Sequence, residues 1–80
     1  MIKLYYNELI RCTKAKIRTL RSQIRIVREL KRVHNESYCD SIKIDYMNCL
    51  KIEYNENVKH LELINEWIRN TTKSLLKELA

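Results

Sequence analysis

The chain contains neither glycine nor proline in its 80 residues, although average usage would supply about ten of them. Glycine provides the positive φ angles of tight hairpin turns and allows the backbone to approach a bound phosphate closely. The absence therefore argues against sandwiches, barrels, phosphate-loop enzymes and dinucleotide-binding folds. It predicts an all-α protein.

An alternation of three- and four-residue spacings between apolar residues predicts a first helix over about residues 2–34. Near the end of this helix, Ile26, Leu30 and Val33 widen the apolar sector, so the last turns are expected to contact more than one neighbour. The main sector, called the apolar stripe below, consists of Ile10, Ile17, Leu20, Ile24 and Val27, with Thr13 in its one polar gap.

The segment His34-Asn35-Glu36-Ser37 interrupts the apolar pattern and predicts a turn at about residues 35–37. Asn35 and Ser37 can each act as a helix N-cap, and Ser37 with Asp40 three residues later resembles a capping box. A second helix is then expected to begin at about residue 38.

The second half keeps one heptad frame, which predicts a single helix over about residues 38–78. Asn57 and Thr71 fill the polar positions of the frame. A single helix is favoured because an inserted loop would usually reset the frame. The alternative is a three-helix bundle with a break near Asn55. The apolar members of the frame are Met47, Leu50, Tyr54, Leu61, Ile64, Ile68 and Leu75.

Together these elements predict one helical domain, residues 1–80, folded as a long antiparallel hairpin. A hairpin turning near Glu36 pairs residues whose numbers add to about 72, which places Ile17 near Tyr54 and Ile24 near Met47 or Asn48. Two helices have a thin core, so we expect a homodimer that forms a four-helix bundle or coiled coil. The predicted core and dimer residues are Ile17, Leu20, Ile24, Val27, Met47, Leu50, Tyr54, Leu61, Ile64, Trp67 and Ile68.

Positive charge is concentrated in the first helix. The chain has a formal net charge of +6, but residues 1–34 contain ten basic residues against Glu8 and Glu29. Seven of the ten recur at alternating spacings of three and four, about 100° around the helix from the apolar stripe. This set, called the basic stripe below, is Arg11, Lys14, Arg18, Arg21, Arg25, Arg28 and Arg32.

Neighbouring like charges at these spacings each oppose helix formation by about 0.2–0.5 kcal/mol, so an anionic partner is expected along the stripe. The stripe extends about 32 Å, close to one turn of duplex DNA, and arginine binds phosphate through two parallel hydrogen bonds. These features predict a small nucleic-acid-binding regulator or accessory protein. The chain has no helix-turn-helix signature, so no base specificity is predicted.

Two other interpretations of the basic stripe remain open. It could dock an acidic protein surface, which would make the chain an adaptor or inhibitor that binds an acidic or apolar surface of a partner protein. Alternatively, acidic residues of the second helix could neutralise the stripe within the assembly. The candidates for that pairing are Asp45, Glu53, Glu56, Glu62 and Glu66.

Other chemistry has little support in the sequence. The residues His34, His60, Cys12, Cys39 and Cys49 lack the paired spacing of metal sites, so no metal and no cofactor are expected. No catalytic constellation is recognisable, which predicts a protein that is not an enzyme. The chain has no apolar stretch of spanning length and no signal-peptide core, so a cytoplasmic protein without membrane contact is expected.

Overall fold

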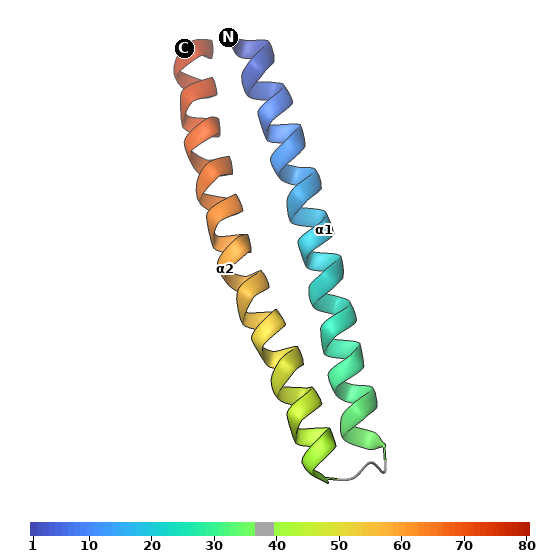
Figure 1. Ribbon diagram of the computed structural model, residues 1–80. Coiled ribbons are helices and arrows are strands. Elements are labelled where there is room, and N and C mark those ends of the chain that lie inside the picture. Colours follow the sequence, from blue (N-terminus) through green and yellow to red (C-terminus); the bar gives the residue numbers. More distant parts are fainter. Residues whose placement is uncertain (37–39) are drawn as a thin grey trace.

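A computed structural model describes residues 1–36 and 40–80 of the chain. Two helices, α1 (Ile2–Asn35) and α2 (Asp40–Leu79), lie side by side in opposite directions, and both termini lie at the same end (Figure 1). The predicted all-α helical hairpin is thus confirmed. Because α2 continues through Asn55 without a break, the alternative three-helix bundle is not formed.

A lysine of α2 satisfies backbone carbonyl groups at the C-terminus of α1. Glu36 leaves the helix with an extended backbone, and its N–H donates to the carbonyl oxygen of Val33 at 3.2 Å. Lys43 Nζ donates to the carbonyl oxygens of His34 (2.7 Å) and Glu36 (3.3 Å), which suits the negative end of the helix dipole. Ser37, the predicted N-cap and the partner of Asp40 in the predicted capping box, lies outside the described residues.

The hairpin is a rod with extents of 60 × 15 × 13 Å and a radius of gyration of 18.1 Å. A compact chain of this length would have a radius of gyration of about 12 Å. The rod exposes 6484 Å², whereas a compact monomer of the same mass would expose about 5,200 Å². The surplus of exposed surface arises because each helix is covered on one side only.

On α2, the line of residues that faces α1, called the seam, follows the predicted heptad frame. Leu50, Ile64 and Leu75 are buried, as is Thr71 in one of the two polar positions. Tyr54 departs from the prediction, because it lies at the edge of the seam and is 38% exposed. The half-buried members of the seam are Met47, Asn57, Leu61 and Ile68.

On α1, the predicted seam is wrong by one residue. The side chains that face α2 include Cys12, Thr19, Gln23, Ile26 and Val33, all of them buried. A shift of one residue rotates a helix face by about 100°. The apolar stripe is consequently turned away from α2, and its members Ile10, Ile17, Leu20, Ile24 and Val27 are 42–54% exposed.

Polar contacts across the seam account for this rotation. Gln23 Nε2 donates to the backbone carbonyl oxygen of Tyr54 at 3.3 Å, and Asn57 Nδ2 donates to Ser22 Oγ at 3.1 Å. Polar groups in a seam need partners, and these two bonds give the amide nitrogens of Gln23 and Asn57 an acceptor each. Near the turn the same seam continues with Ile26 and Val33, which are almost completely buried.

The predicted register is also wrong. The contacts between Gln23 and Tyr54 and between Ser22 and Asn57 join residues whose numbers add to 77 and 79, rather than 72. The centre of the observed pairing lies about three residues closer to the C-terminus than Glu36, the centre of the predicted hairpin. Gln23, and not Ile17, therefore lies opposite Tyr54.

Candidate nucleic-acid interface

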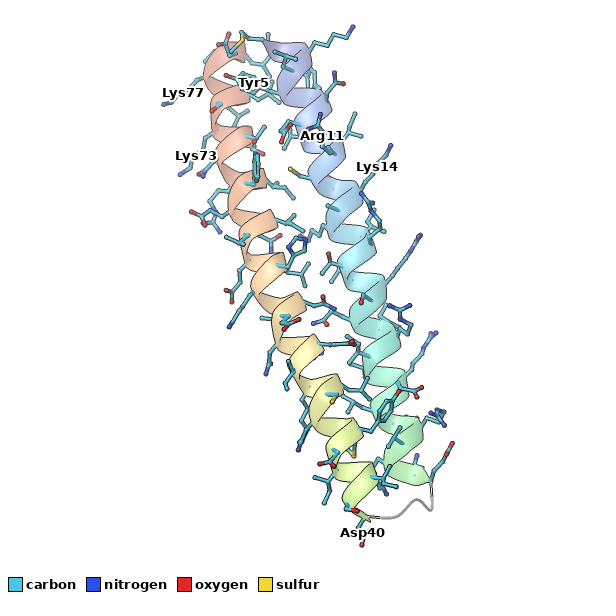
Figure 2. All side chains as sticks on the ribbon, in the orientation of Figure 1. Tyr5, Arg11, Lys14, Asp40, Lys73 and Lys77 are labelled. Atoms are coloured by element: carbon cyan, nitrogen blue, oxygen red, sulfur yellow. The ribbon has the colours of Figure 1, made fainter. Side chains whose placement is uncertain are left out.

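The basic stripe lies on the side of α1 that faces away from α2. Successive steps of about 100° around α1 lead from the seam to the apolar stripe and then to the basic stripe. Lys14 illustrates this direction, because its side chain extends from α1 away from α2 (Figure 2). All seven residues of the stripe are exposed: Arg11, Lys14, Arg18, Arg21, Arg25, Arg28 and Arg32.

The two end members of the stripe form ion pairs with acidic residues close to them in the chain. Arg11 Nη1 lies 3.6 Å from a carboxylate oxygen of Glu8. Arg32 pairs with Glu29, to which its Nε donates at 3.0 Å, and with Glu36, to which its Nη1 donates at 2.7 Å. In each of these pairs the acidic residue lies three or four positions from the arginine in the sequence.

The five middle members have no ion-pair partner within residues 1–36 and 40–80. None of the five acids of α2 that could have neutralised them does so in the described hairpin. Each of these cations also has like-charged neighbours at i+3 or i+4, which repel it. The unpaired members are Lys14, Arg18, Arg21, Arg25 and Arg28.

The basic and apolar stripes adjoin along α1. Ile17 lies in a shallow surface depression together with Lys14, Arg18 and Arg21. A second depression contains Ile24 beside Arg21, Arg25 and Arg28. The aliphatic stems of these long side chains can therefore cover part of the apolar stripe while their charged ends remain in water.

A hydrogen bond between the helices lies at one end of the basic stripe. Tyr46 Oη donates to Glu29 Oε1 at 3.0 Å. Hydrogen bonds from Arg32 and Tyr46 lower the pKa of Glu29 below its ordinary value, while the bond to Glu29 raises the pKa of Tyr46. Sequence reasoning missed this contact because Tyr46 is outside the predicted frame of α2 and the predicted register did not bring it to Glu29.

Trp67, a predicted core or dimer residue, is 59% exposed in the hairpin. It lies with Leu63 and Thr71 beside an open depression that Tyr5 of α1 also lines. Figure 2 places Tyr5 between the helices at the end where the termini meet. In the hairpin, Trp67 is consequently a surface residue that flanks the seam.

The described residues supply no metal-binding group of three or more histidine, cysteine or acidic side chains. Over the same residues, neither helix has a segment long and apolar enough to cross a bilayer. No family model, curated protein or solved structure matches the chain. The geometry of its own residues is thus the basis for a functional proposal.

Proposed function

We propose that the chain is a small cytoplasmic nucleic-acid-binding regulator or accessory protein, and not an enzyme. In this proposal, the basic stripe of α1 contacts phosphate groups of a duplex. The supporting observation is that five consecutive members, Lys14 to Arg28, are exposed and have no ion-pair partner among the described residues. A row of phosphates would relieve the repulsion between them.

The chemistry of the side chains suits phosphate more than a single carboxylate. Four of the five unpaired members are arginines, whose planar guanidinium groups donate two parallel hydrogen bonds to phosphate oxygens. Because phosphate contacts carry no sequence information, binding is expected to depend weakly on base sequence and strongly on salt. A log–log salt dependence with a slope of about −4 to −6 corresponds to five to seven phosphate contacts.

The test compares two triple charge reversals on different helices. Arg18→Glu, Arg21→Glu and Arg25→Glu change the centre of the basic stripe, whereas Lys51→Glu, Lys59→Glu and Lys73→Glu change exposed positions of α2. Both variants have a formal net charge of zero, because each reversal removes two charges from +6. Any difference between them therefore reports the position of the charges.

Binding to mixed-sequence duplex DNA and RNA is measured by fluorescence anisotropy across a salt series, with circular dichroism as the check on folding. The stripe variant is expected to lose at least about 100-fold in affinity, and the α2 variant less than about 10-fold. Equal losses, or a wild-type interaction insensitive to salt, would contradict the proposal.

An acidic or apolar protein surface is the alternative ligand for α1. A stoichiometric complex with one protein that persists after nuclease treatment, together with no salt-dependent duplex binding, would support an adaptor or inhibitor instead.

A further inference from the structure

The hairpin buries the more polar of two adjacent stripes of α1. Thr19 and Gln23 are each 8% exposed in the seam, while the aliphatic side chains of the apolar stripe remain about half exposed. Burial of aliphatic surface is the main favourable term in folding and association. The rotation of α1 therefore leaves its more apolar stripe uncovered, and a partner that covers this stripe would gain the free energy of burying it.

We propose that a second copy of this chain packs on the apolar stripe, with the two α1 helices antiparallel and related by a two-fold axis. The occupant is assigned from the spacing of the stripe. A two-fold interface requires a patch that is complementary to itself. Residues whose numbers add to 37 pair across the axis: Ile10 with Val27, Thr13 with Ile24, and Ile17 with Leu20. None of the six positions is charged, so the pairing buries no charged residue of the stripe.

The area available agrees with a dimer. The chain exposes 6484 Å², which exceeds the expectation for a compact monomer of its mass by about 1,300 Å². A stable interface of standard size removes about 800 Å² from each partner. The surplus surface of the rod is therefore large enough for such an interface.

The angle between the two stripes also fits a bundle. In a square arrangement of four helices, each helix contacts two neighbours at about 90°, and the seam and apolar stripe of α1 are about 100° apart. Where the apolar stripe meets α2, a groove is lined by Leu20, Ile24, Val27 and Tyr54. Gln23 also lines this groove, and its buried Oε1 accepts no hydrogen bond within the described residues. It is thus an acceptor at the edge of the proposed interface.

This geometry predicts where the charges lie. With the two α1 helices adjacent and both α2 helices on one side of them, the two basic stripes point to the opposite side of the bundle. Fourteen cations then form one basic surface, because each copy contributes the seven residues of its stripe. Repulsion between the stripes opposes dimerisation at low salt, so the dimer is expected to strengthen as salt rises.

The test measures the dimer dissociation constant by sedimentation equilibrium without nucleic acid. Ile17→Glu with Leu20→Glu changes the centre of the stripe. Ile42→Glu with Leu63→Glu makes the same change of charge at two exposed apolar positions of α2, where these side chains are 65% and 64% exposed. The wild type and the α2 variant are expected to form dimers, and the stripe variant to dissociate at least about 100-fold more readily while remaining helical. A monomeric wild type, or equal effects of the two variants, would overturn the proposal.

Orientation is tested by mixing two variants whose native cysteines are replaced, one carrying Ile10→Cys and the other Val27→Cys. The antiparallel dimer is expected to form the mixed disulfide, whereas disulfides confined to like chains would overturn the antiparallel arrangement. The dimer does not rest on the proposed nucleic-acid function. Salt separates the two, because phosphate binding weakens with salt and dimerisation strengthens.

Discussion

The two helices of the hairpin distribute their side chains differently. On α1, the seam, the apolar stripe and the basic stripe follow one another around the helix, and each extends over several turns. On α2, one seam faces α1, while basic residues such as Lys73 and Lys77 project from the outer side (Figure 2) and acidic residues are interspersed along the helix. Both surfaces that we propose for binding, the basic stripe and the apolar stripe, therefore lie on α1.

The largest expected effect on stability comes from a comparison of the seam of α1 with its apolar stripe. The same substitution, valine to alanine, is made once in each. Val33→Ala is expected to destabilise the hairpin by about 2 kcal/mol, because Val33 is 1% exposed and its methyl groups leave a cavity. Val27→Ala should change the monomer's stability by less than about 0.5 kcal/mol. Urea unfolding of dilute protein measures both. Comparable losses would show that the seam and the apolar stripe do not differ in burial as described.

A smaller effect concerns the polar contact that joins the helices near their middle. The hydrogen bond from Asn57 Nδ2 to Ser22 Oγ is 3.1 Å long and partly buried. A double-mutant cycle with Asn57→Ala and Ser22→Ala is expected to give a coupling of about 0.5–1 kcal/mol. The same cycle with Asn57→Ala and Ser74→Ala is the control, since Ser74 Oγ bonds within α2. Zero coupling between Asn57 and Ser22 would remove the polar explanation for the rotation of α1.

The smallest effect is a pH dependence at the contact between Glu29 and Tyr46. The pKa of Glu29 is lowered, first by Arg32 and then by Tyr46, so its ionised form favours the folded state. This contribution is present above the ordinary pKa of a glutamate and is lost as pH falls through the lowered pKa. Tyr46→Phe is expected to raise the pKa of Glu29 towards its ordinary value in an NMR titration.

Tyr54→Phe provides the control for this titration, because it removes a hydroxyl from the same helix without changing a hydrogen bond to Glu29. The pKa of Tyr46 is raised by Glu29, so Glu29→Gln should lower it, and the stabilising contribution of that phenol is lost as pH rises through its raised pKa. A Glu29 titration that is identical in the Tyr46→Phe variant and the wild type would show that this contact between the helices does not persist in solution.

Sequence patterns predicted α2 better than α1 for a physical reason. The heptad frame of α2 contains most of its regularly spaced apolar residues, so Leu50 and Ile64 could be assigned to the seam. On α1, two neighbouring stripes have the same alternation of three and four, and sequence alone predicts that the more apolar one faces α2. That prediction is wrong because Gln23 and Ser22 have hydrogen-bond partners on α2, which depends on the opposite helix.

The candidate site was also predictable only in part: the position of the basic stripe could be predicted, and the pairing of its members could not. The basic stripe follows from helical periodicity, because seven cations at those spacings share one face of any α-helix. Whether acids of α2 reach Arg18 or Arg25 could not be predicted, since it depends on the register and rotation of the packed helices.

The amino-acid sequence alone determined that the chain forms two long helices, that the first ends at about residue 35, and that positive charge gathers on one side of the first helix. These properties are local, because they depend on glycine and proline content and on spacings within a few turns. Tertiary structure decided which stripe of α1 meets α2 and which cations stay unpaired. The packing of two helices depends on their whole contact surfaces. A few hydrogen bonds between the helices can outweigh the free energy gained by burying the more apolar of two similar faces.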